Sequence, residues 1–110
     1  MDLDRFTEKT QEAVGTAQEI AIRMKHQQVD GEHLHLALLT QENGLIPRLM
    51  NYMGVDVNLM ISDVERELEK LPAIYGPGAQ NLYASRRFNE ILINASDEAK
   101  KFKDEYTGVE

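Results

Sequence analysis

Residues 30–40 read DGEHLHLALLT, and this segment organises the rest of the chain. Its apolar positions cover almost the whole circumference of a helix: Leu34, Leu36, Ala37, Leu38 and Leu39. A helix that is apolar on nearly all sides should be buried among other elements. Asp30 is a good N-cap, and Glu32 places a negative charge in the first turn, where the helix dipole favours it. The segment therefore predicts a short central helix over residues 32–40.

Helices are also predicted on both sides of this segment. Apolar residues spaced by three, four and seven predict a helix over residues 6–24, with Asp4 or Thr7 as its N-cap. Beyond Asn43-Gly44, two more helices are predicted, over residues 45–53 and 58–71. The first has Pro47 in its opening turn and Gly54 at its C′ position, and Pro72 closes the second.

A linker separates these four helices from a last one. Over residues 72–84, proline and glycine interrupt any periodicity, most clearly at Gly76-Pro77-Gly78. Ser85 then caps a helix with one apolar face, formed by Phe88, Ile91, Leu92, Ala95, Ala99 and Phe102. Because no segment alternates convincingly at a period of two, we predict an all-α fold of short helices.

An internal repeat relates the two ends of the chain. A shift of 78 residues aligns five identical pairs: Glu12 with Glu90, Ala17 with Ala95, Ala21 with Ala99, Lys25 with Lys103 and Glu32 with Glu110. Matching helix faces indicate two pseudo-repeats. Residues 1–71 are then the first repeat, residues 72–84 the linker, and residues 85–110 the start of the second.

The second repeat is expected to be truncated. Thr107 and Glu110 have the spacing of a capping box, which predicts the start of a helix where the chain stops. Phe88, Ile91, Leu92 and Phe102 are therefore expected to lose part of their cover. Exposed apolar area of this kind favours dimerisation or domain swapping.

Charge and composition exclude several classes of function. The chain has 12 Lys and Arg against 19 Asp and Glu, a net charge of −7. It therefore lacks the basic surface that nucleic acids and anionic membranes require. Cysteine is absent, which excludes a disulfide framework and a thiol nucleophile. Residues 1–5 do not resemble a signal peptide and no apolar run is long enough to span a membrane, so a cytoplasmic location is expected.

No catalytic, cofactor or metal site is predicted. His33 and His35 are two apart and would point about 200° from each other on a helix, so they cannot bind one ion together, and His26 is interpreted as isolated. The glycine-rich linker lacks the phosphate-loop pattern. A helical hydrolase using paired carboxylates such as Asp63 and Glu67 is the enzymatic alternative, although no nucleophile or oxyanion donor is adjacent.

Several stretches resemble the N-terminal domain of ClpB-type AAA+ disaggregases. They are the opening MDLDRFTEKTQEA, the segment GEHLHLALL at residues 31–39, Leu71-Pro72 before the glycine-rich linker, and KFKDEY at residues 101–106. The resemblance implies a double-repeat helical bundle that binds unfolded or aggregated polypeptides. It also implies a larger, hexameric parent that works with the DnaK chaperone system. ATP and Mg would bind in later domains, so this chain would have no cofactor and would not itself be an enzyme.

The resemblance also assigns client-binding positions. Thr7, Asp104 and Glu110 match polar positions associated with client binding in the family. From the sequence alone, Thr7 is read as a helix-start hydroxyl and the two carboxylates as solvated or capping groups. The family has an apolar groove between its repeats, but Asn94 and Glu98 stand here where some relatives have leucine.

Two further interpretations concern methionines and a related branch of the family. Met24, Met50, Met53 and Met60 are interpreted mainly as core residues, with a minority on an adaptable surface. As an alternative function, ClpC-type domains bind adaptor proteins or phosphoarginine, which would use Glu32 and Glu110. Gly31 and Val109 precede these glutamates where ClpC-type sequences favour threonine, so the ClpB-type reading is preferred.

Overall fold

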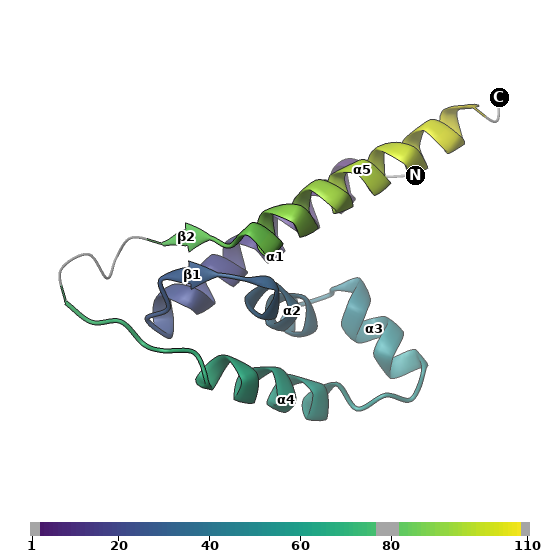
Figure 1. Cartoon of the computed structure of the whole chain (residues 1–110). Coiled ribbons are helices and arrows are strands. Elements are labelled where there is room, and N and C mark those ends of the chain that lie inside the picture. Colours follow the sequence, from purple (N-terminus) through teal and green to yellow (C-terminus); the bar gives the residue numbers. More distant parts are fainter. Residues whose placement is uncertain (1–2, 77–81, 109–110) are drawn as a thin grey trace.

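A computed structural model describes residues 3–76 and 82–108, with side chains for residues 8–76, 82–98, 100 and 101. The elements follow the order shown in Figure 1: α1 Leu3–Arg23, β1 Gln28–Val29, α2 Gly31–Thr40, α3 Leu45–Tyr52, α4 Val57–Glu69, β2 Tyr83–Ala84 and α5 Arg86–Gly108. Each predicted helix is found, with ends shifted by a few residues. The all-α class is therefore confirmed.

Helix α2 occupies the centre, as its sequence predicted. In Figure 1 it lies between α1 and α4, and its buried side chains are His33, Leu34, Leu36, Ala37 and Leu39. Asp30 caps it, because its carboxylate accepts a hydrogen bond from the backbone of Gly31. The side chain of His33 accepts a bond in return from the Asp30 backbone, which completes a capping box in which histidine takes the place of the usual glutamate.

One side of α2 packs in a group that we call the α1 cluster. Its buried members are Ala13, Ala17, Ala21, Val29, Leu34, Ala37 and Phe88. The three alanines of α1 are at most 1% exposed, and their small side chains allow α1 to lie close to α2. Phe88 of α5 is only 2% exposed. The expectation that Phe88 would lose part of its cover is therefore wrong, because the first repeat covers it.

The other side of α2 packs in a second group, the α4 cluster. Its buried members are Leu36, Leu39, Met50, Val64 and Leu68, contributed by α2, α3 and α4. Leu68 is completely buried. The two clusters share no buried residue, so α5 is held by the α1 cluster, whereas α3 and α4 are held by the α4 cluster.

Helices α1 and α3 end in left-handed turns. Gly54 has φ +76°, and the amides of Gly54 and Val55 bond back to Asn51 and Met50, as predicted for a glycine at C′. Helix α1 ends in the same way at Lys25, with φ +60°. The sequence did not predict this left-handed turn, because glycine rather than lysine is the usual residue in that conformation.

A short strand pair connects the first repeat to α5, and the sequence reading missed it. Strands β1 and β2 are parallel, with Gln28 opposite Tyr83 and Val29 opposite Ala84. Two residues per strand are too few to show a period-two pattern. The pair fixes the chain at the start of α5, inside the segment that was predicted to be a linker.

Replacing two of the glycines by alanine is expected to have opposite effects on stability. Gly15 lies within α1 with open space around it, so Gly15→Ala is expected to raise the free energy of unfolding by about 0.5–1 kcal/mol. Gly54→Ala should lower it by about 1–2 kcal/mol, because its left-handed backbone disfavours a Cβ. Urea denaturation measures both variants. A shift in the same direction for both would contradict this assignment.

Candidate functional site

The start of α5 is fastened to the start of α2 by one carboxylate. Asp30 Oδ1 accepts hydrogen bonds from the Gly31 amide at 2.7 Å, the Ser85 hydroxyl at 2.8 Å and Arg87 Nε at 2.9 Å. Ser85 Oγ in turn accepts a bond from the Phe88 amide at 2.9 Å, which confirms Ser85 as the cap of α5. A single oxygen of Asp30 therefore positions both helix ends, and we call this group the junction.

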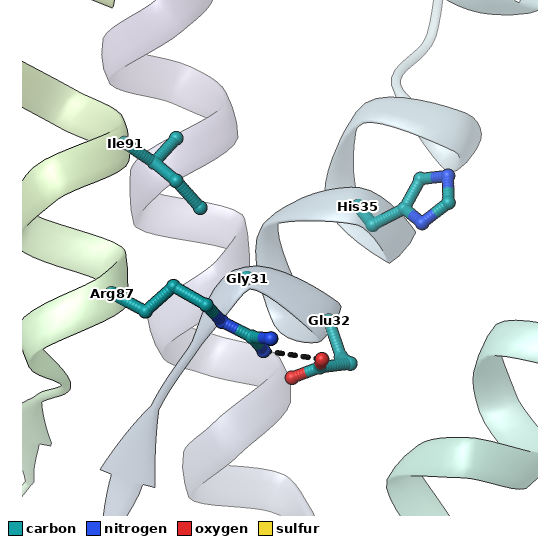
Figure 2. Close-up of a pocket in the computed structure, with 5 residues that line it drawn as sticks. All are labelled: Gly31, Glu32, His35, Arg87 and Ile91. Carbon is teal, nitrogen blue, oxygen red and sulfur yellow. Dashed lines mark hydrogen bonds and ion pairs between the residues drawn. The ribbon is translucent and has the colours of Figure 1, made fainter. Parts of the chain in front are cut away.

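Arg87 spans two carboxylates at this junction. It pairs through Nε with Asp30. It pairs through Nη2 with Glu32, as Figure 2 shows. Hydrogen bonds to Glu32 and then to Asp30 raise the pKa of Arg87. Burial alone would raise the pKa of Asp30, but the bonds from Gly31, Ser85 and Arg87, together with the charge of Arg87, hold that pKa below its usual range. The carboxylate of Asp30 is thus charged at neutral pH, and its Oδ1 accepts three hydrogen bonds.

A shallow pocket of about 250 Å³ lies beside this ion pair. Gly31, Glu32, His35, Arg87 and Ile91 line it, and Figure 2 shows Arg87 reaching from α5 toward Glu32 on α2. A Cβ at Gly31 would lie 3.2 Å from Ile91 Cδ1, so glycine allows this close approach of α5. The pocket combines an ion pair between α2 and α5 with an apolar wall formed by Ile91.

Beneath the junction, two histidines form a buried pair. His26 Nδ1 lies 2.8 Å from His33 Nε2, with the rings edge to face at 71°. His26 is 5% exposed and His33 is completely buried. The interpretation of His26 as isolated is therefore wrong. His26 precedes β1 whereas His33 lies in α2, so the two histidines do not share a helix and the sequence did not link them.

Burial is the main influence on both histidines. It lowers the pKa of His26, and it lowers the pKa of His33 with a further contribution from the neighbouring His26. Hydrogen bonding with Asp30 and the charges of Glu32 and Asp30 oppose the shift at His33 without reversing it. Both imidazoles are consequently neutral near pH 7.

The predicted client-binding residues fall at the margins of the described structure. The backbones of Thr7 and Asp104 belong to α1 and α5, but their side chains lie outside the described residues, as does the whole of Glu110. Asn94 and Glu98 are exposed on α5. Glu32, the alternative contact residue, is engaged by Arg87 rather than free.

An exposed apolar face on α3 is the largest feature that the sequence reading missed. Leu45, Leu49, Tyr52 and Met53 are 62%, 46%, 92% and 72% exposed and follow helical spacing, and we call them the α3 surface. Met50 is buried, and Met24 and Met60 pack partly buried against the α4 cluster. Met53 is thus the exposed minority that the interpretation of the methionines allowed for. One feature of the sequence could have indicated this surface. The apolar residues of α3 cover more of the helix circumference than a single packed side can bury.

Two hydrogen bonds join the start of α1 to the turn that leads into α3. Lys9 Nζ donates a hydrogen bond to the Glu42 carbonyl at 3.2 Å, and Gln41 Nε2 donates to the Lys9 carbonyl at 2.9 Å. These bonds join α1, two residues after Thr7, to the turn that leads into α3.

Among the described residues, none of the helices is long and apolar enough to cross a membrane, and no cluster of three His, Asp or Glu residues could hold a metal ion.

Comparison with known proteins identifies the family. Residues 5–110 match the Clp repeat (R) N-terminal domain. Relatives named Chaperone protein ClpB are 49% identical in Nitratidesulfovibrio vulgaris, 42% in Clostridium tetani and 40% in Bacillus cereus. Each alignment covers 100% of this chain but 13% of the relative, so the chain spans about an eighth of the length of these proteins. The chain therefore belongs to the Clp repeat (R) N-terminal domain family, as an N-terminal domain of the ClpB chaperone type.

Proposed function

We propose that this domain recognises apolar segments of unfolded or aggregated polypeptides and presents them to the ATPase ring of a ClpB-type disaggregase. The observation that carries the proposal is the α3 surface, which consists of three large exposed apolar side chains of an eight-residue helix and that of its C-cap, Met53. A contiguous apolar face left in water marks an interaction site. Similarity to ClpB chaperones makes a non-native polypeptide the fitting partner.

The side chains of the α3 surface suit a binder of many sequences. Met53 has an unbranched, polarisable thioether that repacks at little cost, and Tyr52 offers a rigid ring with a polar tip. Binding of this kind is weak at a single site, because the client loses conformational entropy when it docks. Several copies of the domain around a ring would supply the missing affinity through avidity.

Charge favours clients that carry Lys or Arg among apolar residues. The chain has a net charge of −7, and Glu42 is exposed in the turn that leads into α3. Rim charges of this kind set the encounter rate and the register of a bound peptide. Thr7, Asp104 and Glu110 stay proposed polar contacts on the same basis. Thr7 is the one supported by position, since α1 joins the turn before α3 through Lys9.

The wider setting is also part of the proposal. The parent protein would be a cytoplasmic, hexameric ATPase that cooperates with the DnaK system, and it would bind ATP and Mg in domains beyond this one. The ClpC-type alternative, binding of an adaptor or phosphoarginine at Glu32, is less well supported. Arg87 already supplies a guanidinium to that carboxylate, so an external one would have to displace it.

Substitutions on the α3 surface test the proposal. Leu49→Ser combined with Tyr52→Ser is expected to raise the Kd for an unfolded, apolar, basic-containing polypeptide about tenfold, equivalent to about 1.4 kcal/mol. Fluorescence anisotropy measures this, and the folded form of the same polypeptide should not bind. Ile22→Ser is the matched control, because Ile22 is 61% exposed on α1, away from α3. Equal loss of affinity in the control, or no loss in the double variant, would argue against the α3 surface. Free phosphoarginine should not compete.

A further inference from the structure

A continuous hydrogen-bonded chain runs from the end of α1 to the start of α5. It begins at His26, passes to His33 at 2.8 Å, and continues from His33 Nδ1 to the Asp30 amide at 2.9 Å. The Asp30 carboxylate then holds Ser85 and Arg87. The positions of the ring protons therefore affect the contacts that join the segment after α1, the start of α2 and the start of α5.

The geometry allows only one arrangement of protons. His33 Nδ1 accepts from the Asp30 amide, so the single ring proton of neutral His33 sits on Nε2 and is donated to His26 Nδ1. If His33 were cationic, its Nδ1–H would face the Asp30 N–H. If His26 were cationic, its Nδ1–H would need a bare His33 Nε2, which moves the remaining proton onto Nδ1 and creates the same conflict.

We propose that the His26–His33 pair is a pH-sensitive latch, which holds the start of α5 on α2 when both rings are neutral and releases it when either ring gains a proton. Protonation removes the acceptor of the Asp30 amide and so disturbs the capping box of α2. The Asp30 carboxylate then loses its position relative to Ser85 and Arg87. Release of these contacts uncovers Phe88, which is otherwise 2% exposed.

The surroundings of the pair make protonation costly in the closed state. The groups that act on His33 are His26 from the end of α1, and Asp30 and Glu32 from the start of α2. Arg87 of α5 pairs with both carboxylates and offsets one of their two negative charges, so they compensate a buried imidazolium only in part. Next to His26 in the chain, the Lys25 carbonyl accepts a hydrogen bond from the Ile74 amide at 2.8 Å. Burial dominates over these charges at both rings.

The direction of the pH dependence follows from proton linkage. The folded pKa values of His26 and His33 lie below the ordinary 6.5. The open state therefore binds more protons, and the closed state loses stability as the pH falls below about 6.5. Each proton taken up on opening increases the opening equilibrium constant by up to about tenfold per pH unit.

Release should be local, because α5 and α4 belong to different clusters. Phe88 packs in the α1 cluster, whereas Leu68 packs in the α4 cluster. The amides of Phe88 and Asn89 bond to Ser85, so they report directly on the start of α5. The amides around Leu68 report on the rest of the fold.

Amide hydrogen exchange by NMR between pH 7.5 and 5 tests the latch in the whole chain. After correction for intrinsic exchange, the opening equilibrium at Phe88 and Asn89 should increase about tenfold or more per pH unit below 6.5, and that at Leu68 should increase much less. Histidine nitrogen spectra should show His26 and His33 protonated on Nε2 at neutral pH. Equal increases at both sites, or no increase at Phe88, would overturn the proposal.

Two variants separate the latch from a general effect of acid. His26→Gln removes one of the two titrating rings and should reduce the pH dependence at Phe88, with His33 accounting for the remainder. His35→Gln is the matched control, because His35 lines the pocket from the same helix but its exposed side chain lies outside the buried pair, and it should leave the dependence unchanged. An unchanged slope in His26→Gln would count against the latch. If that variant does not fold, the comparison of Phe88 with Leu68 in the unmodified chain still decides.

Discussion

Phe88→Ala is expected to lower the free energy of unfolding by about 3–5 kcal/mol, the typical cost of removing a buried phenylalanine. Phe88 is the largest fully buried side chain in the described structure, at 2% exposure, and is the buried residue that α5 contributes to the α1 cluster. Urea denaturation followed by circular dichroism measures the change. Because α3 and α4 pack in the other cluster, amide protection should fall more in α5 than in α4.

Ile93→Ala provides the control for this prediction. Ile93 lies on the same helix but is 60% exposed, so its truncation should change stability by less than about 0.5 kcal/mol. A loss at Phe88 no larger than the loss at Ile93 would show that α5 does not depend on the α1 cluster. It would also remove the structural basis for the latch.

Asp30→Ala is expected to lower the free energy of unfolding by about 2–4 kcal/mol. Loss of an N-cap costs about 1 kcal/mol, and hydrogen bonds that involve a charged group contribute about 1.5–3 kcal/mol. Asp30 combines a cap with bonds from Ser85 and Arg87, and these contributions do not add fully. Chemical denaturation at pH 7 measures the effect.

Asp56→Ala is the matched control for Asp30. Asp56 caps α4 in the same way, through bonds to Asn58 and Leu59, but it reaches no second helix. Its loss should cost about 1 kcal/mol. Since the folded pKa of Asp30 is lowered, its stabilising effect is present at neutral pH and is lost as the pH falls below about 4. Equal losses in the two variants would contradict the role of Asp30 at the junction.

Local sequence signals predicted the helices and most of their ends, although α1 begins at Leu3, so the predicted N-caps Asp4 and Thr7 lie inside it. The all-round apolar pattern placed α2 at the centre, and Asp30, Gly54 and Ser85 were each identified from capping preferences that act within a few residues. Such signals are readable because both partners are close in sequence. The resemblance to ClpB-type domains was confirmed by the family match over residues 5–110.

Contacts between distant residues were beyond the sequence reading. Ser85 and Arg87 meet Asp30 across more than 50 residues, and β2 pairs with β1 across a similar gap. The histidine pair depends on a turn at Lys25 that lacks the usual glycine. These features arise from tertiary packing, which overrides local conformational preference. Contacts of this kind leave no pattern in a single sequence.

The candidate binding site was predicted only in part. Family resemblance pointed to Thr7, Asp104 and Glu110, whose side chains lie outside the described residues. The α3 surface was missed because leucine, tyrosine and methionine at helical spacing normally indicate a core face. On α3, one such face is buried through Met50, and the second is exposed. Excess apolar residues on a short helix are therefore the signal to use for this kind of surface.

Client recognition by the α3 surface is tested most directly by ¹H–¹⁵N NMR during a titration with an unfolded, apolar, basic-containing polypeptide. We expect progressive shifts in the amides of residues 45–53, with no shifts when the folded form of the polypeptide is added. Saturating polypeptide that leaves residues 45–53 unchanged would contradict it, whether binding then occurred elsewhere on the domain or not at all.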